Sequence, residues 1–253
     1  MTAPIALQLY TIRDQLAQDY EGTLRKVADM GYAGVETANM FGGSPASAAK
    51  LFGELGLAVS AAHGALPVGD KKQEVLDIIG ALNCKRLILP GQPPEKYTSL
   101  NGIKSVCDAL NEGAAIAKAN GFRVGYHNHW FEYQFVGDPL AIDVMLEHLD
   151  PEVFLEVDVY WVQTAGQNPE EVVRRLGSRA PLLHVKDGPC QRDAPMTALG
   201  EGVVDIPAVV VAGAGSTEWL IVELDECATD MLEAVRRSYG YLIDKGLARG
   251  NKN

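Results

Sequence analysis

Several histidines and acidic residues stand at the ends of short apolar runs, where they could act together. Those that fall on four consecutive runs are His127, Asp158, His184 and Glu223. Imidazole and carboxylate groups are the side chains that hold divalent ions such as Mn²⁺, Zn²⁺, Co²⁺ or Mg²⁺. A cation also offsets the high cost of burying several carboxylates together. We therefore expect these four residues to form a metal site that leaves positions for substrate oxygens.

Further polar or aromatic side chains stand at, or shortly after, the ends of the same and of other runs. They are Glu36, His63, His129, Glu132, Trp161, Lys186 and Asp225. Residues two apart on a strand share a face, which places His129 beside His127. The same spacing places Lys186 beside His184. Four of the five histidines thus fall in the candidate site, and the fifth, His148, is expected on a helix without a role there.

These residues also have structural alternatives. Asp158 could cap a helix, and Glu223 could pair with Lys186. Glu156 could form an interior ion pair with the same lysine. The segment Gly200–Gly202 has two glycines around a glutamate, and because an acidic side chain opposes an anion we interpret it as a loop and not as a phosphate site. Ligand-type side chains stand on four consecutive runs, which is hard to explain by chance and favours the metal site.

The apolar runs that carry these side chains number eight, and a helix-compatible stretch follows each of them. Most runs are apolar at both odd and even positions, which is typical of parallel strands covered on both faces. With 253 residues, the chain has about 32 residues for each strand and helix together. The pattern predicts a (β/α)₈ TIM barrel in one domain, residues 1–253, with its site at the carboxyl ends of the strands. We expect strands at Ile5–Tyr10, Gly34–Thr37, Ala58–Ala62, Arg86–Leu89, Arg123–Asn128, Phe154–Asp158, Leu182–Lys186 and Trp219–Glu223.

A doubly wound open sheet is the alternative arrangement of alternating strands and helices. Its dinucleotide-binding form has the motif Gly-x-Gly-x-x-Gly after the first strand. The corresponding turn of this chain, Tyr10–Asp14, contains no glycine. The barrel is therefore preferred.

Local signals mark where the helices begin and end. Ser44 and Asn168 each precede a proline, as an N-cap residue precedes proline in a first helical turn. The clearest apolar stripe, at spacings of three and four, lies between Ile103 and Ala117 and predicts a helix that ends before Gly121. Left-handed glycines are expected just past four helices, at Gly31, Gly56, Gly121 and Gly177.

Composition excludes several classes of protein. Hydrophobic residues make up 47% of the chain and charged residues 22%, as in an ordinary globular protein and unlike a disordered one. A net charge of −11 repels nucleic acid and anionic membrane surfaces. Four scattered cysteines, without a Cys-x-x-Cys pair, favour a reduced, cytoplasmic setting. Neither a signal peptide nor an apolar run of membrane-spanning length is expected.

Six segments of the chain together resemble the xylose-isomerase-like TIM barrel superfamily. They are Leu7–Asp14, Gly31–Glu36, Tyr126–Glu132, Asp158–Trp161, His184–Asp187 and Val222–Glu223. The superfamily contains sugar isomerases and epimerases, endonuclease IV and inosose-processing enzymes. The resemblance covers nearly the whole chain, and its motifs are fairly specific to the superfamily but not to any substrate.

The resemblance also implies roles for the candidate ligands. In the ketose epimerases of the superfamily, Glu, Asp, His and Glu from four successive strands hold the metal. Three of the four match here, as Asp158, His184 and Glu223, whereas His127 stands where those enzymes have a glutamate that also moves a proton. The sequence His-Asn-His at 127–129 resembles a subgroup, some of whose members process 3-keto sugars or 3-keto glycosides.

Residues and resemblance together suggest a metal-dependent isomerase or epimerase of a small keto sugar or polyol. Removal of a proton next to a carbonyl gives an enediolate that the metal stabilises. We expect Glu223 to be the base, with His127, His129 or Lys186 as the proton partner. The partner is a small-molecule sugar, and a homo-oligomer is left open. Substrate hydroxyls and one sugar face are expected to contact Glu36, His63, Glu132 and Trp161.

Four other functions are considered. A lyase or hydratase acting on a 3-keto sugar or 3-keto glycoside begins with the same proton removal. A non-catalytic sugar-binding barrel would keep the pocket but would not need Glu223 and His184. Endonuclease IV-like DNA repair needs more ligand histidines and a surface that accepts DNA, which the net charge of −11 opposes. A class I aldolase would use Lys186 to form a Schiff base.

Overall fold

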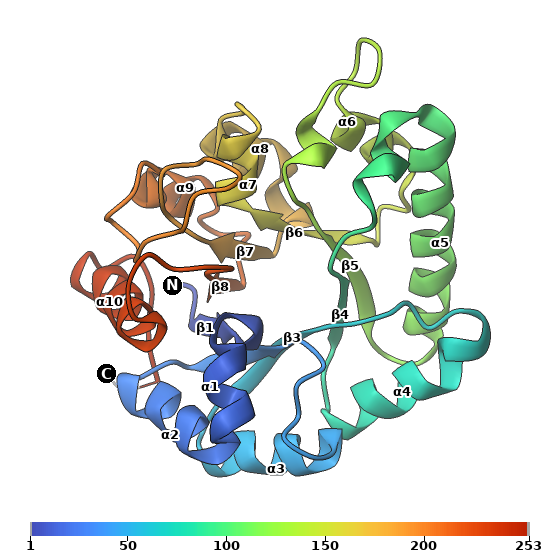
Figure 1. The fold of residues 1–253 in the computed structure, drawn as a ribbon. Coiled ribbons are helices and arrows are strands. Elements are labelled where there is room, and N and C mark those ends of the chain that lie inside the picture. Colours follow the sequence, from blue (N-terminus) through green and yellow to red (C-terminus); the bar gives the residue numbers. More distant parts are fainter. Residues whose placement is uncertain (1, 252–253) are drawn as a thin grey trace.

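Eight parallel strands close into a barrel (Figure 1). The computed structural model describes residues 2–251 of the 253. Each strand pairs with the next one in the sequence, and β1 pairs with β8. This confirms the (β/α)₈ barrel and excludes the open sheet. The strands are β1 (Ile5–Gln8), β2 (Gly34–Thr37), β3 (Ala58–His63), β4 (Arg86–Leu89), β5 (Arg123–His127), β6 (Phe154–Asp158), β7 (Leu182–Val185) and β8 (Trp219–Val222).

Helices surround the barrel on its outside, as Figure 1 shows. At least one helix separates each strand from the next, which allows all strands to run in parallel. The α-helices are α1 (Arg13–Gln18), α2 (Tyr20–Met30), α3 (Pro45–Glu54), α4 (Lys72–Ala81), α5 (Leu100–Ala119), α6 (Ala141–His148), α7 (Val159–Thr164), α8 (Pro169–Leu176), α9 (Ile206–Ala212) and α10 (Met231–Asp244). Short 3₁₀ turns are η1 (Leu9–Ile12), η2 (Gly69–Lys71), η3 (Pro94–Thr98), η4 (Phe131–Tyr133) and η5 (Gly177–Arg179).

Several strands end earlier than the sequence predicts. The Gln8 side chain accepts a hydrogen bond from the backbone N–H of Tyr10 at 3.1 Å, so β1 stops at Gln8 and the chain turns into η1. Strands β5, β7 and β8 each stop one residue early, whereas β3 continues to His63. Lys186 and Glu223 therefore lie just beyond their strands, at the mouth of the barrel.

The expected helix signals hold at most positions. Ser44 and Asn168 cap α3 and α8 through their side-chain oxygens, and a proline follows each cap. Helix α5 ends at Ala119, and Gly121 follows with φ of 80°. Gly177 differs, because its ψ of −127° is not that of a left-handed helical residue and it begins η5 instead.

Side chains inside the barrel are arranged in layers along its axis. The layer nearer the amino ends of the strands is apolar and consists of Ala6, Ala61, Ile88, Phe154, Leu182 and Ile221. A Cβ on Gly125 would lie only 2.4 Å from the Phe154 ring, which explains the glycine. Residues two further along a strand share its inward face. At the carboxyl ends these next inward residues are polar, and they include Gln8, His63, Glu156, His184 and Glu223.

A larger apolar core lies between the barrel and its helices. The buried hydroxyl of Tyr32 donates to the carbonyl of Val235 at 2.9 Å, which ties the start of β2 to α10. The apolar layer and this outer core together support the polar layer from below and from the sides. Within residues 2–251, no helix has both the length and the apolar character required to cross a membrane.

Candidate active site and metal centre

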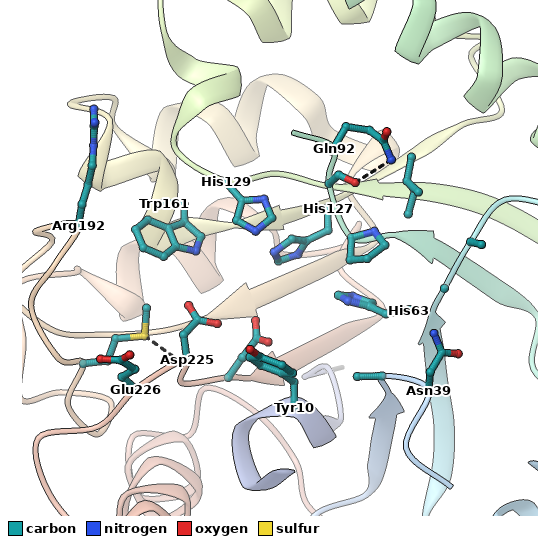
Figure 2. A pocket seen from close by; sticks show the side chains of 18 of the residues that line it. Tyr10, Asn39, His63, Gln92, His127, His129, Trp161, Arg192, Asp225 and Glu226 are labelled. Atoms are coloured by element: carbon teal, nitrogen blue, oxygen red, sulfur yellow. Dashed lines mark hydrogen bonds between the residues drawn. The ribbon is translucent and has the colours of Figure 1, made fainter. Parts of the chain in front are cut away.

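A cavity of about 920 Å³ opens at the carboxyl ends of the strands, and Figure 2 shows many of its lining side chains. Six of the side chains singled out from the sequence line it, namely His63, His127, His129, Trp161, Glu223 and Asp225. Three more predicted residues are buried against the floor of the cavity, and these are Asp158, His184 and Lys186. This position matches the active-site end of other β/α barrels.

The four predicted metal ligands come together at the floor of the cavity. One ligand atom each from His127, Asp158, His184 and Glu223 lies within 4.8 Å of the others. Strand register explains part of this arrangement, because Asp158 pairs with His184 across β6 and β7. Glu223 directly follows β8, the next strand of the barrel. Two imidazoles and two carboxylates form a donor set that suits a divalent ion.

Asp158 divides its two carboxylate oxygens between the fold and the site. Oδ1 accepts a hydrogen bond from the backbone N–H of Trp161 at 3.0 Å, which caps α7 and confirms the structural interpretation of this residue. Oδ2 faces the ligand set, where Nζ of Lys186 lies 3.0 Å away and Nε2 of His127 lies 3.7 Å away. Burial raises the pKa of Asp158 to about 6. A buried carboxylate oxygen that faces a cationic side chain and an imidazole at this point fits a ligand to a cation.

Lys186 is the positive charge that faces these carboxylates. Its Nζ lies 3.0 Å from Oδ2 of Asp158, 2.7 Å from Oε2 of Glu223 and 2.9 Å from Oδ2 of Asp225. The contact with Glu223 confirms the ion pair considered from the sequence. Burial alone would lower the pKa of Lys186, but the three carboxylates raise it well above its usual value. The amine is therefore protonated and is no nucleophile, which argues against a Schiff-base aldolase.

A divalent ion and the Lys186 ammonium would neutralise the same two carboxylates. Asp225 gives the lysine a partner outside the ligand set, so it can keep one ion pair while an ion takes Asp158 and Glu223. The residues present therefore fit a divalent ion at this position.

Both ring nitrogens of His184 face carboxylates. Nδ1 lies 2.8 Å from Oε2 of Glu223, and Nε2 lies 2.7 Å from Oε2 of Glu36. Metal-binding histidines commonly donate their second N–H to a carboxylate, which fixes the ring and its tautomer. His184 can thus donate from Nε2 to Glu36 and offer Nδ1 to an ion.

Glu36 and Glu156 lie beneath the floor and are both fully buried. Oε2 of each lies 2.7–3.1 Å from Nε2 of both His63 and His184. The Gln8 amide donates to Glu36 as well, at 2.6 Å. This corrects the expectation that Glu36 contacts substrate, because its partners are buried protein groups. The expected pair of Glu156 with Lys186 is also wrong, since Glu156 contacts histidines instead.

His127 has one nitrogen toward the buried layer and one toward the ligand set. Nδ1 lies 3.1 Å from Oε2 of Glu156, and Nε2 faces Asp158. Burial, together with the neighbouring histidines and Lys186, holds the pKa of His127 well below its usual value. The ring is therefore neutral, the state in which imidazole binds metals.

Glu132 is buried at the end of a chain of hydroxyl groups. The Tyr126 hydroxyl donates to Oε1 of Glu132 and also contacts the hydroxyl of Tyr97. The backbone N–H of His129 donates to Oε2 at 2.8 Å. Glu132 thus holds the segment that carries His129, which corrects the expectation that it contacts substrate. Burial raises the pKa of Glu132 to about 8.

Glu132→Gln is expected to flatten the pH dependence of stability. The folded chain keeps the Glu132 proton up to about pH 8, whereas the unfolded chain loses it near the ordinary value of 4.5. The contribution of Glu132 to wild-type stability therefore falls as pH rises through this window, by up to about 5 kcal/mol at ~1.4 kcal/mol per pH unit. Urea unfolding at about pH 5 and about pH 8.5 should show a smaller change in the glutamine variant.

The matched control is Glu147→Gln, because Glu147 is an exposed glutamate on α6. This variant should follow the wild-type pH profile. Parallel profiles for wild type and Glu132→Gln would show that Glu132 is ionised in the folded chain.

His129 and Trp161 form one wall of the cavity (Figure 2), with their ring centres 6.4 Å apart. Phe131 stacks on His129 with 5.2 Å between ring centres. Burial and the charge of Lys186 lower the pKa of His129 to about 4, so its ring is neutral. A neutral imidazole beside an aromatic surface can exchange a proton with a bound molecule.

Other lining residues were not singled out from the sequence. They come from loops, and they include Tyr10, Asn39, Gln92, Arg192, Asp193 and Glu226. Asn39 follows β2 by two residues and has φ of 58°, a left-handed conformation that asparagine tolerates. An asparagine shortly after the end of a strand is therefore a sequence signal that could have identified this lining residue. Arg192 lies in the long segment between β7 and α9, where no periodic pattern marks it.

The profile of the xylose isomerase-like TIM barrel family matches residues 24–242. The chain belongs to this family. The match confirms the resemblance and covers five of the six sequence segments, whereas Leu7–Asp14 lies outside it. No curated protein matches the sequence.

Solved structures of xylose isomerase-like barrels are similar to the chain over almost its whole length. A sugar phosphate isomerase/epimerase from Parabacteroides distasonis ATCC 8503 is 27% identical, with a TM-score of 0.82 over 97% of this chain and 99% of that one. The probable 3-DHS dehydratase AsbF from Bacillus anthracis is 12% identical, with a TM-score of 0.77 over 96% and 99%. The IOLI protein, solved with a zinc atom, is 16% identical, with a TM-score of 0.71 over 95% and 97%. The last two show a shared fold.

Proposed function

We propose that the chain is a divalent-metal-dependent isomerase or epimerase of a small keto sugar or polyol. The observation that carries this proposal is the set of four ligand atoms within 4.8 Å of one another, at the floor of a cavity of about 920 Å³. A cavity of this size accommodates a sugar. Membership of the family and the 27% identity to a sugar phosphate isomerase/epimerase support the same class.

The ligands would be His127, Asp158, His184 and Glu223, whose atoms the fold already gathers. When bound, a divalent ion supplies Lewis acidity, which lowers the barrier where negative charge develops next to a carbonyl. The zinc atom in the IOLI structure supports a metal in this fold.

Glu223 removes the proton next to the substrate carbonyl. It lines the cavity, and Lys186 and His184 hold its Oε2 at 2.7 and 2.8 Å. Burial alone would raise the pKa of Glu223, but the charges of Lys186 and His184 lower it, so the carboxylate is ionised at neutral pH. Loss of the substrate proton gives an enediolate. Addition of a proton to the other face of the same carbon gives an epimer. Addition of a proton to the neighbouring carbon gives an isomer.

Lys186 and His129 are the residues that can supply the proton added to the enediolate. Lys186 is protonated and touches Glu223, so it can donate a proton to the enediolate and recover one from Glu223, which carries the proton taken from carbon. His129 is neutral and lines the cavity beside Trp161. In Figure 2, His129 and Trp161 lie on one side of the cavity, and Tyr10 and Asp225 lie on the other. A sugar between them has one face on the Trp161 ring.

Exchange of a substrate proton with solvent deuterium tests this proposal. Metal-loaded protein in D₂O is mixed with free ketoses, inososes and 3-keto glycosides, and NMR follows the C–H signals. One member of the panel should lose the signal next to its carbonyl, and a chelator should stop the loss. An isomerase or epimerase conserves the composition of the sugar. A lyase or hydratase, the second candidate, adds or releases water or an aglycone.

The matched control is His148→Asn. His148 is a histidine on α6 whose Nδ1 contacts the carbonyl of Val144, away from the cavity. This variant should exchange at the wild-type rate. Saturable sugar binding by folded, metal-loaded protein without any exchange would instead identify a non-catalytic sugar-binding barrel.

A further inference from the structure

The loop after β7 is closed around a carboxylate that belongs to the chain itself. The Asp187 carboxylate is fully buried and accepts backbone N–H groups from Gly188 at 2.8 Å, Gly200 at 2.8 Å and Val204 at 3.1 Å. β/α barrels that bind phosphate commonly do so with backbone N–H groups of the loops after strands 7 and 8. In this chain, the Asp187 side chain accepts three backbone N–H groups of the loop after β7.

The glycines of Gly200–Gly202 are explained by the same carboxylate. A Cβ on Gly202 would lie 2.1 Å from Oδ1 of Asp187 and 2.1 Å from the backbone nitrogen of Gly188. Glycine is therefore needed so that the loop can close around Asp187. Glu201 points to another partner, because it forms an ion pair with Arg237 of α10. The segment is packed against its own loop, and the backbone N–H groups of Gly200 and Glu201 already have partners there.

The loop after β8 has no spare donors at its start either. The backbone N–H of Glu223 donates to Val185, that of Leu224 to the hydroxyl of Thr11, and that of Asp225 to the sulfur of Met196. Helix α10, which follows, begins with a cap by Asp230, whose carboxylate accepts the N–H of Glu233 at 2.8 Å. A phosphate site in the loop after β8 would need free backbone N–H groups. This loop instead presents the carboxylates of Glu223, Asp225 and Glu226 to the cavity.

The charged side chains around the cavity also disfavour a phosphate group. Four carboxylates line it, those of Asp193, Glu223, Asp225 and Glu226. Within residues 2–251, Arg192 is the only arginine or lysine in the lining. Its guanidinium carbon lies 3.4 Å from the centre of the Trp130 ring, at the rim. Figure 2 shows its side chain extending away from the histidines.

We propose that the substrate of this cavity carries no phosphate and is an uncharged sugar, polyol or keto derivative of one. This inference rests on the proposed function and names the substrate class of the same site. A phosphate group would lie among four carboxylates, the backbone N–H groups described above already have protein partners, and the Lys186 charge beneath the floor is already paired with three carboxylates. Repulsion in a cavity walled by protein is strong. Hydroxyl groups instead find the phenol of Tyr10 and the amides of Asn39 and Gln92. The substrate class thus differs from the sugar phosphates named for the Parabacteroides distasonis protein.

Matched pairs of sugars test the inference. D-fructose is compared with D-fructose 6-phosphate, and D-ribulose with D-ribulose 5-phosphate, by calorimetry and by deuterium exchange on metal-loaded protein. The phosphorylated member of each pair should bind at least about tenfold more weakly, or exchange more slowly by that factor. Equal or tighter binding of either sugar phosphate would overturn the inference.

Inorganic phosphate gives a second arm that does not depend on activity. It is titrated into metal-free protein, so that coordination to an ion cannot contribute. No saturable binding is expected up to about 10 mM. Saturable binding that Arg192→Ala abolishes would overturn the inference. If no sugar of either kind binds or exchanges, the proposed function fails, and this arm still decides whether the cavity accepts an anion.

A variant with two rim charges removed, Asp193→Asn with Glu226→Gln, tests the physical cause. Both residues line the cavity, and neither is a candidate ligand or base. The difference between the two members of a pair should shrink by about threefold or more if carboxylates cause the discrimination. An unchanged difference would overturn the electrostatic cause.

Discussion

Glu223→Gln is expected to lower turnover by about 10²–10⁴-fold, the usual effect of losing a general base. Glutamine has the same shape but cannot accept a proton from carbon. Its amide also faces Lys186 and His184, which hold Oε2 of the wild-type carboxylate at 2.7 and 2.8 Å. The measurement is the rate of deuterium exchange on the substrate that the panel identifies.

Loss of metal could imitate loss of the base, because Glu223 is also a candidate ligand. Metal content is therefore measured by mass spectrometry on the same sample as the rate. A slow, folded, metal-loaded variant supports the assignment. Near-normal exchange by that variant would move the base to His127, His129 or Lys186. Glu147→Gln, which removes an exposed carboxylate on α6 outside the cavity lining, is the matched control and should retain exchange.

His184→Ala is expected to reduce metal affinity by more than about 100-fold, since loss of a group behind a ligand alone costs ~10–100-fold. The substitution removes Nδ1 from the ligand set and leaves Glu36 without its partner at Nε2. Titration of Zn²⁺ and Mn²⁺ into chelator-treated protein measures the effect. His148→Ala, on α6, should bind metal as the wild type does. Unchanged affinity in His184→Ala would remove this site from consideration.

The alanine variant also exposes buried carboxylates to each other, so its fold needs a second check. Asp158→Asn provides it, because asparagine caps helices about as well as aspartate. The amide oxygen can still accept the N–H of Trp161, as Oδ1 does at 3.0 Å in the wild type. This variant should keep its melting temperature within a few degrees and still lose metal affinity. Normal metal binding by a folded Asp158→Asn variant would restrict Asp158 to the capping of α7.

The barrel and the clustering of the four candidate ligands could be predicted because they depend on local pattern. Each strand is a short apolar run between helices, and residues two apart share a face in any strand. Closure of the sheet then brings the ends of β5 to β8 together, whatever the details of the loops. Asp158 and His184 are level in that register. Their approach is expected from the order of the strands together with the position of both residues near the carboxyl ends of neighbouring strands.

The depth of a side chain within the barrel could not be predicted in this way. Glu156 pairs with Leu182 in the register, which places it four residues below Lys186. The expected ion pair between them is too far apart along the axis, and Glu156 meets His184 instead. The residue types of Glu36 and Glu132 suit contacts with substrate hydroxyl groups, which is what the sequence predicts for them. Only the packed structure shows that protein donors already occupy them.

Asp187 has a consequence for the dynamics of the protein. A loop that closes around a substrate phosphate is ordered only when the ligand arrives, and the lost entropy weakens binding. The loop after β7 is held by the buried carboxylate of Asp187, bonded to three backbone N–H groups before any ligand binds. Its conformation is therefore preorganised, and the affinity for substrate is not reduced by folding this segment. We expect its amides to exchange slowly with solvent in free protein and to change little when a sugar is added.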